Sequence, residues 1–399
     1  MNPSKNQSAM SVGRTVITAK HLFNGSCLID DPFLVLEDGC IRSISTRAAS
    51  ALPDDARILD YSEATIAPAF LDVHIHGAAG HDVMEATPDA LGPIGKFLAS
   101  HGTGSFLATT VTAPLDATLR AVSGLAKAIA QPADVGVAHP IGIHLEGPFV
   151  SFAKRGVQPA EHLLAPDGKV FDQLFEAAEG TIRLMTLAPE LPGAAELIAH
   201  ATKLGVHVSL GHSNATAAET CAAIVAGATS ATHTFNAMRP LDHREPGILG
   251  AVLTDDAVYA ELICDGVHTA PEAVRLWWRA KGPERAILVT DAMSATGMPD
   301  GEYRLGGFDV QLKDGRAMAG GVLAGSVLTL DRALANFLKF TGATVAQGLR
   351  LFTANPASLI GARGGEGSVV VGRPANLVVV DSDGSLKASY VKGRLCSAE

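Results

Sequence analysis

The chain has 399 residues, of which 47% are hydrophobic and 18% charged, and a mean hydropathy of +0.22. This composition argues against a disordered protein, and no apolar run reaches the roughly 18 residues that a membrane helix needs. The formal net charge of −10 argues against nucleic acid as a partner but allows an anionic small ligand held by a few local cations. The five cysteines are scattered and odd in number, so we expect no disulfide framework and a cytoplasmic location.

The two ends of the chain share one character. Residues 1–13 lack the apolar core of a signal peptide and are predicted to form a flexible tail. Residues 14–64 alternate short β-rich runs with turns, and residues 360–399 repeat that pattern. We therefore predict a small β-sandwich domain that both ends build together.

The middle of the chain, residues 65–359, alternates apolar runs of strand length with stretches of helical character. Eight runs are present, at residues 65–76, 105–112, 140–147, 182–190, 207–213, 230–237, 259–266 and 285–292. Near-continuous apolar strands indicate a parallel sheet covered on both faces, and eight of them joined by crossovers predict an α/β fold with a (β/α)8 TIM-like barrel. A doubly wound open sheet is the competing architecture.

Polar side chains of the metal-binding and catalytic types end most of these runs. They are His74 and His76 in the first run, Glu146 in the third, His212 in the fifth, His233 in the sixth, Asp265 in the seventh and Asp291 in the eighth. In a barrel the carboxyl ends of the strands meet at one mouth, whereas in an open sheet they are spread along an edge. The pattern favours the barrel and predicts that these side chains meet in one site.

His74 and His76 are two residues apart, so on a strand both side chains point to one face. Taken alone, the pair fits structural histidines as well as metal ligands. The other strand ends shift the balance, because histidines and carboxylates around a divalent ion that keeps one position for water form a catalytic site. Those strand-end residues are Glu146, His212, His233 and Asp291.

Asp291 ends the last run, where a carboxylate can take a proton from the attacking water and return it to the leaving group. Its alternative role is to cap the following turn. We favour the general base because the site otherwise lacks one. Glu146 is either a buried ion-pair partner or a bridge between two metals, and His144 shares its face of the strand.

Further candidates lie outside the metal ligands. Asn236 and Ala237 follow His233 closely, and Arg244 lies in a loop between prolines, where a guanidinium either binds a phosphate bidentately or is simply solvated. His268 contacts substrate or lies at the surface. Residues 323–326 either lend backbone amides to an anion or precede a helix.

Nine segments together closely resemble the N-acetylglucosamine-6-phosphate deacetylase family of the amidohydrolase superfamily. In chain order they are PAFLDVHIHG, HLEGPF, LGHSNA, HTFNAMRPLDHREPG, DGVH, VTDAM, LAGS, TANPAS and GRPANLVVVD. One such motif is weak, whereas this many in order are specific. The resemblance implies a barrel flanked by a β-sandwich. It also implies a hydrolase that converts N-acetylglucosamine 6-phosphate to glucosamine 6-phosphate and acetate, in amino-sugar catabolism and cell-wall recycling.

The resemblance also implies roles for individual residues. Glu146, His212 and His233 would hold one divalent metal, and His74, His76, Glu146 and Asp291 a second. Zinc is the expected ion, with Fe2+, Mn2+ or Co2+ as alternatives, and Asp291 would act as base and then as acid. Asn236, Ala237 and Arg244 would bind the phosphate, with Arg244 reaching in from the neighbouring subunit of a homodimer. The sugar would contact His268, Leu323, Ala324, Gly325 and Ser326.

One position departs from the family pattern. Some members carry a histidine in a KGxH segment, where this chain has Gln158, which can donate a hydrogen bond but cannot carry charge. N-acetylgalactosamine-6-phosphate deacetylase is therefore the alternative within the family. A cyclic amidase of the dihydroorotase type fits less well, because Glu146 takes the place of its bridging modified lysine. A barrel protein that only binds partners would have no need of the intact ligand set.

Overall fold

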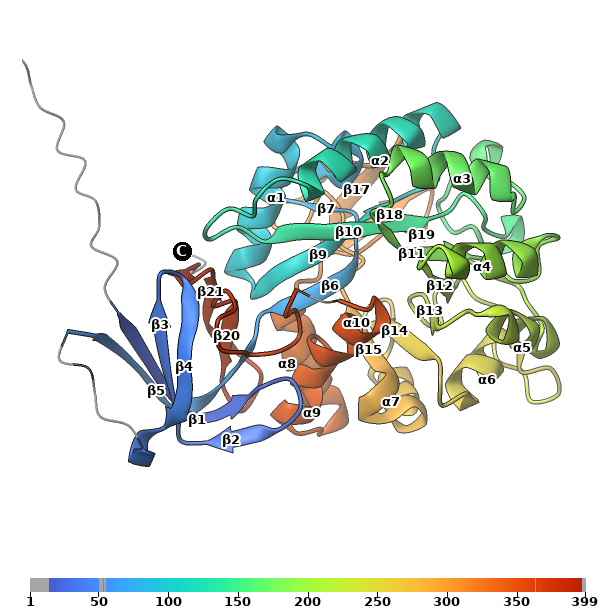
Figure 1. Ribbon diagram of the computed structural model, residues 1–399. Helices are drawn as coiled ribbons and strands as arrows, with labels where there is room; N and C mark the ends of the chain where they lie inside the picture. Colours follow the sequence, from blue (N-terminus) through green and yellow to red (C-terminus); the bar gives the residue numbers. More distant parts are fainter. Residues whose placement is uncertain (1–13, 50–52, 54, 363, 397–399) are drawn as a thin grey trace, which may run out of the picture.

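The computed structural model describes residues 14–49, 53, 55–362 and 364–396. Figure 1 shows two bodies side by side: a barrel ringed by helices, and a sheet in which the blue N-terminal strands lie beside the red C-terminal ones. The predicted tail, residues 1–13, lies outside the described residues. The predicted domain limits, 64/65 and 359/360, stay a prediction.

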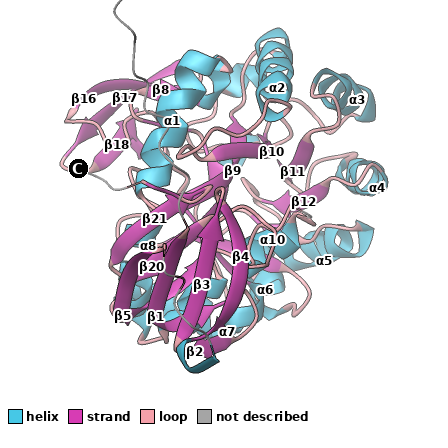
Figure 2. Cartoon of the chain, turned by 60° about the vertical axis from the view of Figure 1, so that its left-hand side comes forward, coloured by secondary structure: helices cyan, strands magenta, loops and turns pink. Residues whose placement is uncertain are grey.

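The terminal sheet joins strands from both ends of the chain. Its strands are β1 (Thr15–Phe23), β2 (Leu28–Asp30), β3 (Pro32–Glu37), β4 (Cys40–Thr46), β5 (Arg57–Pro68), β20 (Leu377–Val380), β21 (Leu386–Val391) and β22 (Arg394–Leu395). The order is β22-β21-β20-β5-β1-β3-β4, and β2 pairs with β1. The sheet curls, since Cys40 at the start of β4 forms a bridge with Pro374, close to β20 (Figure 2). One apolar core fills it, including Ile17, Leu34 and Tyr390.

The barrel contains the predicted eight parallel strands. They are β6 (Phe70–Ile75), β9 (Thr103–Thr110), β10 (His139–Glu146), β11 (Ile182–Leu187), β12 (His207–Leu210), β13 (Ser230–Ala231), β14 (Tyr259–Ile263) and β15 (Ala286–Val289). Just beyond β15, the Asp291 N–H donates to the His74 carbonyl at 2.9 Å and the His76 N–H donates to the Ala292 carbonyl at 2.8 Å. The end of the last strand therefore meets the first, as a barrel requires.

The first predicted run, 65–76, is divided between two sheets. Its opening residues complete β5 and pair with β20, where Pro68 is the final partner. Proline has no N–H to donate to a ladder, so pairing stops readily there. The barrel strand β6 starts at Phe70.

Helices surround the barrel and follow most of its strands (Figures 1 and 2). They are α1 (Pro88–Ser100), α2 (Leu115–Ile129), α3 (Gly168–Ala177), α4 (Ala194–Lys203), α5 (Ala217–Ala226), α6 (Gly247–Thr254), α7 (Pro271–Arg285), α8 (Leu330–Thr341), α9 (Val345–Arg350) and α10 (Ala354–Leu359), with 3-10 turns η1 (Arg47–Ala49), η2 (Val83–Glu85), η3 (Phe152–Lys154) and η4 (Ala160–His162). Local signals explain several starts: Thr216 and Glu219 form a capping box at α5. Within the described residues, no helix combines the length and apolar character needed to cross a membrane.

A small antiparallel sheet between β15 and α8 was absent from the sequence prediction. It contains β16 (Gly301–Leu305), β17 (Phe308–Lys313), β18 (Arg316–Ala319) and β19 (Val322–Leu323), and a separate hairpin pairs β7 (Gly77–Ala78) with β8 (His81–Asp82). Gly-Gly, Asp-Gly and Gly-Gly pairs separate the four strands, which is the usual signal of two-residue hairpin loops. The Gly306 N–H donates to Asp82 at 2.7 Å and ties this sheet to the barrel mouth.

The floor of the barrel depends on an aromatic pair. Phe70 in β6 and Phe352, between α9 and α10, are fully buried with ring centroids 5.2 Å apart, and the Leu71 N–H donates to the Phe352 carbonyl at 2.8 Å. We expect Phe352→Ala to lower the free energy of unfolding by about 3–5 kcal/mol, because it leaves a cavity in a packed core. Urea denaturation followed by circular dichroism measures the change.

Val225→Ala is the matched control, since Val225 is 89% exposed on α5 and its truncation should change stability by no more than about 0.5 kcal/mol. Equal denaturation midpoints for Phe352→Ala and the control would show that the floor does not depend on this pair.

Candidate active site

The predicted strand-end residues gather at the carboxyl ends of the barrel strands. A cavity of about 420 Å³ opens there. Of the predicted site residues, it is lined by His76, Glu146, Gln158, His212, His233, Asn236, Ala237, His268, Asp291, Leu323 and Gly325. Its outer wall includes apolar residues of the inserted sheet, Leu305, Phe308 and Val322.

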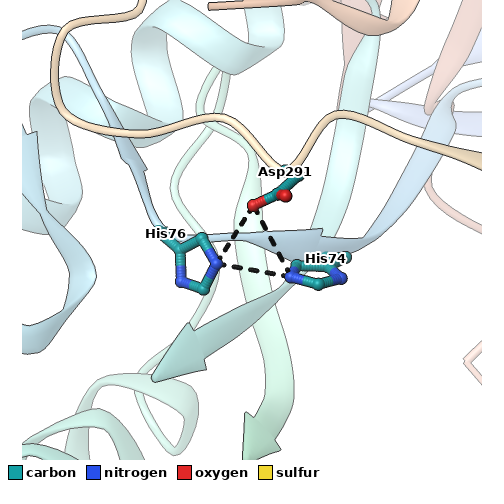
Figure 3. Close-up of side chains that lie close together, drawn as sticks. All are labelled: His74, His76 and Asp291. Carbon is teal, nitrogen blue, oxygen red and sulfur yellow. Dashed lines mark hydrogen bonds and ion pairs between the residues drawn. The ribbon is translucent and has the colours of Figure 1, made fainter. Parts of the chain in front are cut away.

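His74, His76 and Asp291 form one group of potential metal ligands (Figure 3). Nε2 of His74 lies 3.3 Å from Nε2 of His76, and Oδ1 of Asp291 lies 3.2 Å from His76 Nε2 and 3.7 Å from His74 Nε2. His74 comes from β6 and His76 directly follows it, while Asp291 comes from the loop after β15. The barrel closure described above thus brings the three side chains together.

Glu146, His212 and His233 form the second group. Oε1 of Glu146 lies 3.2 Å from Nε2 of both His212 and His233, and the two imidazole nitrogens are 3.1 Å apart. The same carboxylate reaches the first group, since Oε2 lies 3.4 Å from Nε2 of His76 and Oε1 lies 3.5 Å from Nε2 of His74. The carboxylate of Glu146 therefore contacts the imidazole nitrogens of both groups.

The spacing of these atoms fits a divalent ion. Ligand atoms bound at about 2.0–2.1 Å to a tetrahedral zinc ion lie about 3.3 Å from one another. Nδ1 of His76 donates to the Thr109 carbonyl and Nδ1 of His212 to the Lys154 carbonyl, both at 2.9 Å, while Nδ1 of His74 is 3.2 Å from Oε2 of Glu261. Because Nδ1 carries the proton in these contacts, Nε2 of the neutral ring keeps its lone pair for a metal.

Three of the six potential ligands hold an uncommon backbone conformation. His212, His233 and Asp291 have φ values of +46°, +30° and +50°, in the left-handed region. Such a residue costs about 1–3 kcal/mol unless its surroundings fix it. The strain turns the chain sharply at the strand end and directs the side chain over the barrel mouth.

The carboxylates give the site a negative potential. Burial alone lowers the pKa of His74, but the carboxylates of Glu146, Asp291 and Glu261 outweigh burial and raise that pKa to about 10. The pKa of His76 is raised in the same way, with Asp291 and Glu146 opposing burial. Conversely, burial acts to raise the pKa of Glu146, but His74 and His212 hold it well below its usual range. The carboxylates therefore stabilise positive charge in this site. Protons on the histidines can provide that charge, and so can a bound divalent cation.

Other predicted residues lie around this centre. Gln158 is buried, donates to Oε2 of Glu146 at 3.2 Å and accepts from the Thr112 N–H at 2.9 Å, so both ends of its amide contact the protein. His268 contacts Asp265 at 2.6 Å through Nδ1, and that carboxylate raises the histidine pKa against the effect of burial.

The loop at 323–326 forms hydrogen bonds with the main chain at Asp291, the candidate general base. Ser326 donates its N–H to the Asp291 carbonyl at 2.7 Å and its hydroxyl to the Thr290 carbonyl at 2.6 Å. Ala324 and Ser326 are buried and do not line the cavity, whereas Leu323 and Gly325 do. The helix α8 begins later, at Leu330.

Arg244 is exposed and does not line the cavity of its own chain. Its backbone N–H donates to Oδ1 of Asp242 at 2.8 Å, and this hydrogen bond orders the loop.

Sequence reasoning missed two groups in this region. Glu261 is fully buried within β14 and contacts His74, and the signal that reveals it is one acidic residue inside the apolar strand YAELI. Lys154 lines the cavity from η3.

His144 lies behind the potential ligands, between the Val73 carbonyl at 3.1 Å and the Thr186 hydroxyl at 2.8 Å, and burial keeps its pKa well below the usual value.

Comparison with known proteins agrees with this geometry. The model of the amidohydrolase family matches residues 65–396. This chain belongs to the amidohydrolase family. It is 40% identical over 386 residues to N-acetylgalactosamine-6-phosphate deacetylase of Escherichia coli O157:H7, covering 96% of this chain and 99% of the relative. N-acetylglucosamine-6-phosphate deacetylase of Bacillus subtilis (strain 168) is 36% identical over 370 residues, covering 92% and 93%.

Comparison with a solved structure agrees with this family assignment. N-acetyl-D-glucosamine-6-phosphate deacetylase of Mycobacterium smegmatis superposes with a TM-score of 0.88 at 36% identity, covering 96% of this chain and 99% of that chain. Family membership and the two ligand groups make this amidohydrolase a metal-dependent one.

Metal content should separate the two ligand groups. We expect His212→Ala to lose the ion held with Glu146 and His233, and His76→Ala to lose about one equivalent per subunit from the other group, because each variant removes one of the few ligands of an ion. Mass spectrometry of the metal in purified protein measures both. His81→Ala, a nearby histidine outside both groups, should keep the wild-type content. Wild-type content in both ligand variants would contradict the assignment.

Metal binding should strengthen with pH. The pKa of His74 is raised to about 10, so this ring holds a proton at neutral pH when no ion is bound, and an ion must displace that proton; the raised pKa of His76 acts in the same direction. Affinity should therefore rise from about pH 6.5 to about pH 8.5, with protons released on binding. Competition with a chromophoric chelator measures the affinity, and a constant value across this range would refute the expectation.

Proposed function

We propose that this amidohydrolase removes the acetyl group of N-acetylglucosamine 6-phosphate and releases glucosamine 6-phosphate and acetate. The observation that carries the proposal is the pair of buried ligand groups joined by Glu146 beneath a cavity that Asp291 also lines. Relatives at 36% identity and the matching solved structure carry this activity in their names. A role in amino-sugar catabolism and cell-wall recycling, in the cytoplasm, follows from that substrate.

The alternative substrate is the galactosamine epimer. It is favoured by the relative with 40% identity over 99% of its length, which is named for N-acetylgalactosamine 6-phosphate. Gln158 adds to this, because it stands where some members of the deacetylase family carry histidine. The hydrolytic chemistry is the same for both sugars, so the choice concerns only the sugar contacts.

The residues of the site suit amide hydrolysis. A bound divalent ion, for which we propose zinc with Fe2+, Mn2+ or Co2+ as alternatives, supplies a water of lowered pKa and positive charge for the amide carbonyl. Asp291 lies in contact with this centre, accepts the proton of the attacking water and delivers it to the nitrogen of the leaving amine. The water oxygen bonds to the acetyl carbon, the C–N bond then breaks as the carbonyl re-forms, the amine leaves with the delivered proton, and the acetyl group remains as acetate.

The outer residues hold the sugar phosphate in this proposal. Asn236 and Ala237 line the cavity and contact the phosphate, while His268, Gln158 and the 323–326 loop surround the sugar. Asp265 contacts Nδ1 of His268 at 2.6 Å and so fixes the orientation of that ring at the cavity wall. Arg244 lies outside its own cavity, so it contributes only by reaching the site of a neighbouring subunit in a homodimer.

Acetate release tests the function. We expect release from N-acetylglucosamine 6-phosphate or its galactosamine epimer, loss of activity on chelation, and recovery when metal is added back. Enzymatic quantification of acetate measures each arm. No release from either sugar phosphate would reject the deacetylase.

The base is tested by Asp291→Asn. The substitution keeps size but removes the proton acceptor, and we expect kcat to fall by about 10²–10⁴-fold. Metal held by Glu146, His212 and His233 should remain, as measured by metal analysis of the same preparation. An unchanged kcat in this variant would show that Asp291 is not the general base.

A further inference from the structure

The proposed substrate carries a phosphate, yet the site is dominated by carboxylates. A phosphate needs a local cation, because the chain is acidic overall and the site has a negative potential. The predicted cation, Arg244, does not line the cavity of its own chain. Among the described residues that line it, Lys154 is the one lysine or arginine.

The main chain of Lys154 is fixed against a metal ligand. Its carbonyl accepts the Nδ1 proton of His212 at 2.9 Å, and its N–H donates to the Ser151 carbonyl at 3.0 Å. Ser151 in turn donates its N–H to the His212 carbonyl at 2.9 Å. The turn that carries Lys154 thus has a set position relative to the metal centre, and only its side chain remains to adapt.

The same segment adjoins the predicted phosphate contacts. On the other side of His212, the Ser213 N–H donates to the Ala237 carbonyl at 3.0 Å, and the Arg239 N–H donates to the Ser213 carbonyl at 2.9 Å. Residues 151–154 and 236–239 therefore flank the two consecutive residues His212 and Ser213. Both segments line one cavity, so a group bound to Asn236 and Ala237 is near the turn of Lys154.

The ammonium of Lys154 is available for a ligand. It has no hydrogen-bond or ion-pair partner among the residues that the structure describes, although the side chain is half-buried. Neighbouring cations are engaged: the Arg155 guanidinium lies 4.6 Å from the ring centroid of Phe152 and donates to the Phe152 carbonyl, and Arg239 donates to the Asn214 carbonyl. A half-buried, unpaired ammonium at the rim of an anionic centre is a site for an anion.

We propose that Lys154 binds the phosphate of the substrate within one subunit, beside Asn236 and Ala237. The assignment rests on the proposed deacetylase and adds a second cation to it. Lys154 therefore sets the preference for phosphorylated over plain N-acetyl amino sugars. Arg244 then closes the phosphate site from outside rather than forming it.

Lys154→Met tests this assignment, because it keeps the apolar stem and removes the charge. We expect the ratio of kcat/KM for N-acetylglucosamine 6-phosphate to kcat/KM for N-acetylglucosamine to fall by at least about tenfold, as for a lost hydrogen bond to a charged group. Lys154→Arg should restore most of the ratio. Arg155→Met, the matched control, removes a neighbouring cation that already has a partner and should leave the ratio unchanged.

A binding measurement separates this proposal from the function itself. Calorimetric titration with glucosamine 6-phosphate should show weaker binding to Lys154→Met than to the wild type, with equal metal content in both. An unchanged affinity together with an unchanged substrate ratio would overturn the assignment. The assignment would also be overturned if Arg244→Ala lowered the ratio of kcat/KM values and Lys154→Met did not, since phosphate binding would then depend on the neighbouring subunit. Absence of acetate release from the wild type would instead reject the deacetylase.

Discussion

The candidate metal centre depends on the contacts that the carboxylate of Glu146 makes with both groups of histidines. Its two oxygens lie 3.2–3.5 Å from the imidazole nitrogens of both ligand groups. A buried carboxylate is costly to remove from water unless positive charge compensates it. The four histidines and any ion that they hold provide that charge, so the two groups form a single electrostatic unit. Gln158 and Thr112 hold the carboxylate in place from outside this unit.

The fold brings this unit together through closure of the barrel. His74 lies on the first barrel strand and His76 directly follows it, Asp291 follows the last strand, and two backbone hydrogen bonds join these segments. Left-handed turns at His212, His233 and Asp291 then direct the side chains over the mouth. The inserted sheet adds apolar residues to the cavity wall, and an apolar wall strengthens electrostatic interactions beside it because it lowers the local dielectric constant.

The sequence predicted the barrel and its catalytic end because both leave periodic traces. Apolar runs of strand length marked all eight strands, and the polar residues that ended them share the cavity or lie beside it. The run at 230–237 was wrong in extent, since β13 covers only Ser230–Ala231 and the left-handed residues that follow turn the chain into the site. The contact of His74 with Glu261 joins residues 187 positions apart, which no local pattern reveals. The small sheet was not predicted, although the Gly-Gly and Asp-Gly pairs between its strands are a local signal of hairpin loops.

Glu261 links the two ligand groups in a way that constrains how related chains can diverge. One oxygen of this fully buried carboxylate accepts from the His74 ring at 3.2 Å and from the His233 N–H at 3.4 Å, and its other oxygen has no hydrogen-bond partner among the described residues. A lineage that replaced His74 would leave this buried carboxyl group with the His233 N–H as its remaining partner among the described residues, and a buried polar group that lacks partners is destabilising. Position 261 should therefore change together with position 74, and its identity should indicate in related sequences whether the group of His74, His76 and Asp291 has been kept.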